Sequence, residues 1–178
     1  MKFSQRVTLS VVVPATATAL LAVGAGGASL WAEARLNNYF EHLDKQAAAV
    51  TEMYAQGLQM GQSLRNVVLN PEDGKAVDNY KAAQKLYAEA DAEARAAGVP
   101  ESQALLAAAT TSRSKLQAVQ LELLDLAKTD TSRSAARLKT EETPQWRELR
   151  TALLDLKRQS TEQRADWISQ TRTLLRRA

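Results

Sequence analysis

LNNYFEHLDKQAAAVTEMYAQGLQMGQSLRNVVLN, residues 36–70, repeats its apolar side chains at helical spacing over five heptads. One row recurs every seven residues and a second row lies three positions later: Leu36, Leu43, Val50, Gly57 and Leu64, then Tyr39, Gln46, Met53, Met60 and Val67. Such a stripe is typical of a helix that buries one face. Pro71 disfavours helical geometry at Asn70, so we expect a helix over residues 32–69.

The segment before this stripe carries no charge from Val7 to Trp31. A helix over it would be about 37 Å long, enough to cross a hydrocarbon core of ~30 Å. The sequence therefore predicts a transmembrane helix over 7–31, with residues 1–6 in the cytoplasm because of Lys2 and Arg6, and residues 32–178 outside it. A cleaved signal peptide is the alternative, since a positive start and small residues near Ala28 suit a peptidase. The length of the uncharged run favours a retained anchor.

Three further helices are expected after the stripe, over residues 75–97, 101–128 and 132–178. Glycine, proline and short polar residues separate them, as in Pro71–Gly74, Gly98–Pro100 and Thr129–Thr131. Short connections reverse the chain each time, which predicts an all-α, antiparallel up-down four-helix bundle. On the second helix we expect six residues to face inward: Ala76, Tyr80, Ala83, Tyr87, Ala90 and Ala94. On the third helix we place seven residues in the core: Leu105, Ala109, Ser112, Leu116, Val119, Leu123 and Leu126. Pro144 requires either a kink or a short helix before it.

The composition argues against an enzyme. The chain has no cysteine, and His42 is its one histidine, so we expect no catalytic residue, no metal site and no cofactor. No glycine-rich phosphate loop or nucleophile elbow is present. The net charge of +3 comes without an aromatic-interleaved basic stripe, so no nucleic acid is expected as a partner.

Polar residues gather where the first helix ends. Arg65 offers a planar fork of donors for a carboxylate, and amides can donate or accept. The candidate ligand-binding residues come from this end and from the start of the fourth helix: Gln59, Gln62, Arg65, Asn66, Arg133, Arg137 and Thr143. A solvated helix face, or helix-end charges paired with Glu141 and Glu142, is the alternative.

Three more residues on the first helix suggest close packing or a dimer interface. Gly57 and Gly61 remove side chains where a neighbouring helix could approach. Gln46 occupies a core-facing position, where a buried polar residue can fix register. Trp146 and Trp167 are expected to fill core space, with ligand stacking as the alternative.

Two segments carry a family resemblance: YAQGLQMGQSLRNVVLNP, residues 54–71, and LKTEETPQW, residues 138–146. Together with the layout of the chain, they resemble the sensor region of bacterial methyl-accepting chemotaxis receptors. The resemblance implies a homodimer with paired first helices, and a ligand held between helices near the end far from the membrane. It also implies an inner-membrane location, with residues 32–178 in the periplasm.

The predicted function is therefore a sensor that detects a small molecule, an organic acid or other anion being favoured, and moves the fourth helix relative to the first. Cytoplasmic signalling partners would act through a C-terminal region that this sequence lacks, so we expect it to be a fragment. Histidine kinases and cyclic-dinucleotide enzymes share this kind of bundle and remain alternatives. A membrane-anchored helical protein that dimerises or binds a partner protein is another.

Overall fold

The computed structural model describes the backbone of residues 3–175 and the side chains of residues 33–170 and 173. Helices account for nearly all of this part of the chain, and no strand occurs in it, so the predicted all-α class is confirmed. The chain divides into two compact units, Met1–Phe40 and Glu41–Ala178. Helix α1, Phe3–Leu69, begins in the first unit and ends in the second.

The first unit contains the predicted membrane span. Over the described residues, no helix is both long and apolar enough to cross a membrane. The span predicted at Val7–Trp31 lies outside the residues whose side chains are described and stays a prediction. In the described part of this unit, the rings of Tyr39 and Phe40 have their centroids 6.4 Å apart.

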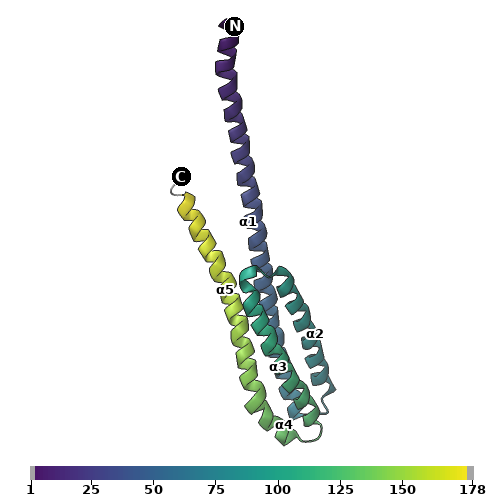
Figure 1. Ribbon diagram of the computed structural model, residues 1–178. Coiled ribbons are helices and arrows are strands. Elements are labelled where there is room, and N and C mark those ends of the chain that lie inside the picture. The colour runs from purple at the N-terminus through teal and green to yellow at the C-terminus, as the bar shows by residue number, and fades with distance from the viewer. Residues whose placement is uncertain (1–2, 176–178) are drawn as a thin grey trace. The chain divides into compact units, whose positions relative to one another are not determined.

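After α1, the described part of the second unit contains three long helices and three short helical segments. They are α2 (Gly74–Ala97), the 3-10 turn η1 (Pro100–Ser102), α3 (Gln103–Ala127), α4 (Thr131–Arg137), the π-helical turn η2 (Leu138–Glu142) and α5 (Thr143–Leu175). Within this unit α1, α2, α3 and α5 lie side by side (Figure 1). Asp73 caps α2 by accepting a hydrogen bond from the Ala76 amide, and Asp130 caps α4 in the same way.

The buried core of the second unit takes side chains from α1, α2, α3 and α5. On α1 the expected rows are buried from Leu43 to Val68, and on α2 all six residues expected to face inward are buried: Ala76, Tyr80, Ala83, Tyr87, Ala90 and Ala94. On α5 the buried row is Leu149, Leu153, Leu156 and Ser160. The prediction that Trp167 fills core space is wrong, because its side chain is 40% exposed.

The buried face of helix α3 overlaps in part with the expected one, since Ala109, Leu116 and Leu123 are buried as predicted. Its buried residues are Leu106, Ala109, Arg113, Leu116, Gln120, Leu123 and Ala127. Leu105, Ser112, Val119 and Leu126 are only half-buried. At these four positions the prediction is wrong by one residue, because it was chosen by hydrophobicity, whereas the polar residues Arg113 and Gln120 belong to this core.

The short helix α4 and the turn η2 precede Pro144, which corresponds to one of the two alternatives expected from the sequence. Pro144 has no N–H to donate, and the wider π-helical turn immediately precedes the α5 start at Thr143. The Thr143 hydroxyl donates to the Leu138 carbonyl oxygen, five residues earlier, at 3.1 Å. Glu142, the last residue of η2, is thereby held in the core at 1% exposure.

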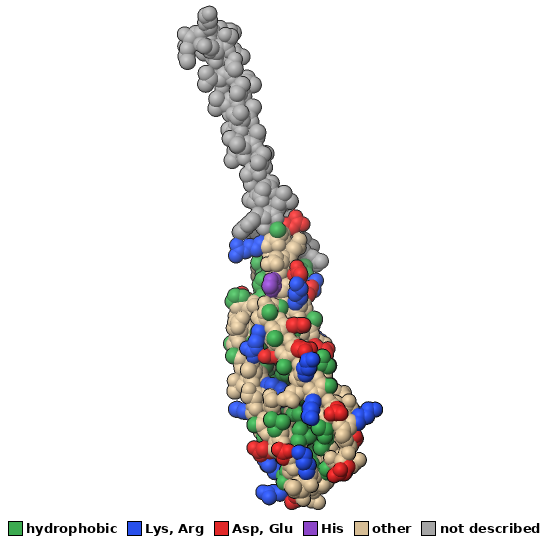
Figure 2. Space-filling view, turned by 90° about the vertical axis from the view of Figure 1, so that its right-hand side faces the viewer, with side chains coloured by type: hydrophobic (Ala, Val, Ile, Leu, Met, Phe, Trp, Pro, Cys, Tyr) green, Lys and Arg blue, Asp and Glu red, His purple; other side chains and the backbone are tan. Residues whose placement is uncertain are grey.

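On the face shown in Figure 2, acidic and basic side chains of the second unit are interspersed rather than sorted by sign. This face does not present the continuous basic stripe typical of a nucleic-acid interface.

Candidate functional site

The ligand residues predicted on α1 lie on its outer surface. Gln59, Gln62, Arg65 and Asn66 are all exposed, whereas their neighbours Gly61 and Ser63 are buried. The structure thus places the four in a solvent-facing row. This arrangement is the solvated helix face given above as the alternative. The four side chains are also accessible to a ligand or a partner protein.

Arg137 is held by two carboxylates. Its Nε lies 2.8 Å from Glu141 Oε1, and its Nη2 lies 2.7 Å from Glu141 Oε2 and 2.8 Å from Glu122 Oε2. The hydrogen bonds that Arg137 donates to Glu141 and Glu122 raise the pKa of Arg137, and the contact with Arg137 lowers the pKa of Glu141. An anionic ligand at Arg137 would have to compete with both acids.

The other predicted residues of this end have local roles in the structure. Arg133 is exposed, and its backbone amide donates to Asp130 Oδ1 at 2.9 Å. Thr143 contributes the hydroxyl that closes the π-helical turn. These placements correspond to helix-end contacts, the alternative stated from the sequence.

Gly57 and Gly61 lie where other side chains approach α1 closely. A Cβ atom on Gly57 would be 2.6 Å from Cη2 of Trp146, so the indole packs directly on this glycine. A Cβ atom on Gly61 would be 3.6 Å from Arg65 Nη1 and 3.8 Å from Glu142 Oε1. Arg65 therefore extends toward the buried carboxyl group of Glu142 across Gly61.

Gln46 is fully buried within the chain. Its Nε2 donates to the Ser102 hydroxyl at 2.7 Å, and that hydroxyl donates to the Val99 carbonyl oxygen at 2.8 Å. The amide oxygen of Gln46 has no hydrogen-bond partner. The residue thus ties α1 to the connection between α2 and α3.

A polar network crosses the core of the second unit. Its centre is Gln120 on α3, which is fully buried. Gln120 Oε1 accepts from the Tyr80 hydroxyl at 3.1 Å and from Arg113 Nη1 at 3.3 Å. Gln120 Nε2 donates to Glu142 Oε1 at 3.1 Å. Arg113 Nη2 also lies 3.2 Å from the sulfur of Met60, so the network joins α1, α2, α3 and η2.

Two buried ionisable side chains, Arg113 and Glu142, are linked through the side-chain amide of Gln120. Arg113 is 7% exposed, and among the described side chains no carboxylate lies within ion-pair distance of it. Its guanidinium carbon lies 5.0 Å from the Tyr87 ring centroid, a cation–π contact that offsets part of the cost of burial. Gln120 then links this cation to Glu142, accepting from one and donating to the other.

The network is incompletely satisfied. Glu142 Oε2 and the Tyr87 hydroxyl are both buried, and neither has a hydrogen-bond partner in the part of the chain that the structure describes. Burial raises the pKa of Glu142 above its usual value, against the opposing effects of the Gln120 hydrogen bond and the Arg65 charge. Burial also raises the pKa values of Tyr80 and Tyr87. Unpaired polar groups in a core carry a free-energy penalty, so they mark a place where the packing can change.

Sequence reasoning missed three of these residues as a functional group: Arg113, Gln120 and Glu142. A signal for the first two was present, because Leu106, Arg113, Gln120 and Ala127 are spaced by seven. Polar residues in register with a heptad row are candidates for a buried network. Glu142 gave no such signal, since its inward position depends on the π-helical turn.

A groove of about 560 Å³ lies elsewhere on the second unit, between α1 and α2. Four alanines line it, Ala48, Ala49, Ala96 and Ala97, together with three titratable side chains, His42, Lys45 and Glu93. Over the described residues, no three histidine, aspartate or glutamate side chains are grouped closely enough to hold a metal ion. None of the predicted ligand residues lines this groove.

Comparison with known proteins adds a fold-level likeness. The chain matches no protein-family model and no curated protein. Among solved structures it resembles a periplasmic sensor domain of a sensor histidine kinase, with 24% sequence identity and a TM-score of 0.65. The match covers 71% of this chain and 88% of that domain. At this identity the likeness shows that the two share a helical fold.

Proposed function

We propose that this chain is the sensor module of a membrane-anchored signalling receptor, with its helices forming an antiparallel four-helix bundle in the periplasm. The observation that carries the proposal is the buried polar network that joins α1, α2, α3 and η2. An all-apolar core would hold these helices by shape alone. A network with two unpaired oxygens can exchange partners, and so can favour more than one helix arrangement.

In this proposal a small anionic ligand binds one arrangement more tightly than the other and so shifts the population between them. The shift moves α5 relative to α1 within a homodimer. The membrane anchor and cytoplasmic signalling partners carry the change to a chemotaxis output. The resemblance of residues 54–71 and 138–146 to chemotaxis receptors supports this choice of output.

A histidine-kinase output is the second candidate. The observation that favours it is the fold likeness to the periplasmic sensor domain of a sensor histidine kinase. Fusing this chain to the cytoplasmic part of a chemoreceptor, and separately to that of a histidine kinase, distinguishes the two outputs. The fusion whose output responds to added ligand identifies the signalling type.

A distance measurement tests the sensing proposal itself. The chain contains no cysteine, so spin labels can be attached at Glu52→Cys on α1 and Lys157→Cys on α5, both at exposed positions. We expect a small carboxylate that binds the full chain in nanodiscs, as measured by calorimetry, to change the distance distribution between the labels. Binding without any change would contradict a signalling role, and failure of every carboxylate and inorganic anion to bind would contradict ligand sensing.

A further inference from the structure

A second groove, of about 230 Å³, lies between α2 and α3. Its lining comes from both helices: Gln84, Tyr87, Ala88 and Asp91 from α2, and Thr110, Arg113, Ser114 and Gln117 from α3. At ~30 Å³ for each water molecule, it has room for about seven water-sized groups, which suits a small ligand. None of the residues predicted from the sequence to bind ligand takes part in it.

One lining residue of the groove is Arg113, a cation with no carboxylate partner among the described side chains. Two hydrogen bonds from Arg113 go to the neutral acceptors Gln120 Oε1 and Met60 Sδ, although a guanidinium has five N–H donors. Removing a charge from water without an opposite charge beside it is costly. A ligand carboxylate would supply that charge, and it matches the planar fork of a guanidinium.

A second, independent observation at the same groove concerns the hydroxyl group of Tyr87. Tyr87 lines the groove at 3% exposure, and its hydroxyl has no hydrogen-bond partner. A hydroxyl left unpaired in a protein interior carries a penalty that a ligand oxygen can remove by accepting its proton in a hydrogen bond. Arg113 and Tyr87 are already in contact through the cation–π geometry, so one ligand could reach both hydrogen-bond donors.

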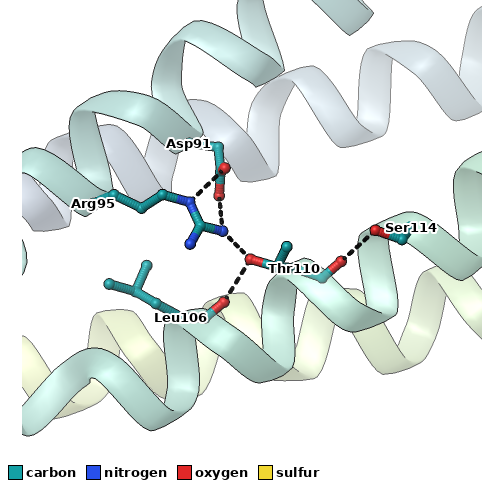
Figure 3. Close-up of polar contacts among 5 residues, drawn as sticks. All are labelled: Asp91, Arg95, Leu106, Thr110 and Ser114. Atoms are coloured by element: carbon teal, nitrogen blue, oxygen red, sulfur yellow. Dashed lines mark hydrogen bonds and ion pairs between the residues drawn. The ribbon is translucent and has the colours of Figure 1, made fainter.

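The rim of the groove is fixed by a chain of hydrogen bonds between α2 and α3 (Figure 3). Arg95 donates to both oxygens of Asp91, at 2.8 and 3.2 Å, and also to the Thr110 hydroxyl. Thr110 in turn donates to the Leu106 carbonyl oxygen at 2.8 Å, and Ser114 donates to the Thr110 carbonyl oxygen at 3.0 Å. Asp91 is therefore neutralised by Arg95, and the charge of Arg113 is left to attract an anion.

We propose that the α2–α3 groove binds a small monocarboxylate, with Arg113 pairing with the carboxylate and Tyr87 donating a further hydrogen bond to it. The proposal rests on the proposed sensory function only for its biological role. It places the ligand between α2 and α3, where the sequence predicted no ligand residue, instead of at α1 or at α4, where Arg137 already pairs with two acids.

Calorimetry on the full chain in nanodiscs tests this site, with sodium propionate, lactate and benzoate as probes and inorganic phosphate as the comparison. We expect at least one carboxylate to bind, and Arg113→Gln to weaken its binding about tenfold or more. Lys115→Gln removes the same charge from an exposed position on the same helix and should leave binding unchanged. Equal losses in the two variants, tighter binding of phosphate, or no carboxylate binding would each overturn the proposal.

Two variants keep the test decisive if Arg113→Gln fails to fold. Ala88→Trp fills the groove from an exposed lining position without changing any charge, and it should abolish binding. Tyr87→Phe removes only the unpartnered hydroxyl, so we expect weaker carboxylate binding with no fall in the unfolding temperature. Unchanged binding in both variants would show that the ligand lies elsewhere. If the wild type still binds and its helices still move, the sensor proposal stands while this site is rejected.

Discussion

Gly57 and Gly61 differ in what their missing side chains would meet, although both lie on α1 one turn apart. Replacing glycine with alanine inside a helix favours folding by about 1 kcal/mol. At Gly57 the new Cβ would be 2.6 Å from Cη2 of Trp146, and overpacking of this kind costs about 1–3 kcal/mol. At Gly61 the nearest atom is at 3.6 Å, an ordinary contact.

We therefore expect opposite signs for the two substitutions. Gly57→Ala should lower the unfolding temperature of the full chain, and Gly61→Ala should raise it. Circular dichroism at 222 nm during heating measures both. Combining Gly57→Ala with Trp146→Phe tests the cause, because a smaller ring should recover most of the loss. If Gly57→Ala were as stabilising as Gly61→Ala, the indole would not be packed on this glycine.

Glu142 makes stability depend on pH. Because burial raises its pKa in the folded state above the usual value of 4.5, the folded chain binds more protons than the unfolded chain between those two values. Its contribution to the free energy of unfolding is therefore fully present below about pH 4.5, and it is lost as the pH rises through the folded-state pKa. Glu142→Gln keeps an oxygen for the Gln120 amide but cannot ionise.

We expect Glu142→Gln to gain stability relative to the wild type as the pH rises from 4.5 to 7.5. Thermal unfolding of both proteins at several pH values measures this difference. Glu148→Gln, an exposed substitution on α5, is the matched control and should show a difference that does not vary with pH. A constant difference for Glu142→Gln as well would mean that its carboxyl group ionises normally in the folded chain.

At the scale of the elements, hydrophobic spacing predicted α1 and α2 well and α3 less well. Where core positions are apolar or small, as from Tyr80 to Ala94 on α2, the period alone identifies the buried face. On α3 the same method selected the neighbouring face, because Arg113 and Gln120 belong to the core by packing and hydrogen bonding rather than by hydrophobicity. The chemistry of Arg65 made it a candidate ligand-binding residue, and this remains a prediction. Nothing in the sequence indicated that Arg65 lies near Glu142.

The π-helical turn explains why Glu142 escaped prediction. Such a turn holds one residue more than an α-helical turn, so counting by 3.6 residues across it assigns the wrong face. The sequence predicted that the helix is interrupted at Pro144, but it did not predict a π-helical turn there. Deleting one exposed residue from the turn should keep the flanking residues in phase, although Pro144 then lies inside a regular helix and lowers the stability.

We expect the deletion of Thr140, exposed in η2, to give a folded chain with cooperative unfolding. Deleting Arg150, exposed in the regular part of α5, rotates Leu153 and Leu156 by about 100° relative to Leu149 and should prevent cooperative unfolding. Circular dichroism on heating compares the two. If both deletions abolished cooperative unfolding, the π-helical turn would carry no extra residue.

At the scale of the whole molecule, the proposed receptor role depends on the orientation of the chain in a membrane. Lys2 and Arg6 precede the uncharged segment, and the positive-inside rule predicts a cytoplasmic location for them if that segment spans the membrane. The second unit, which begins at Glu41, would then lie in the periplasm, where it can meet a ligand from outside the cell. The two sides of the segment can be distinguished chemically, because every cysteine in a variant is an introduced one.

We expect a membrane-impermeant maleimide to label Asp78→Cys, at an exposed position on α2, in intact spheroplasts. Ser4→Cys should be labelled only after lysis, because the predicted anchor would hold it on the cytoplasmic side. Labelling of both before lysis would contradict the orientation. Loss of the introduced thiol at position 4 from the mature protein would instead show that a signal peptidase has removed the segment. In that case a displacement in the second unit could not reach the cytoplasm through residues 7–31, and the receptor proposal would lose its route for the signal.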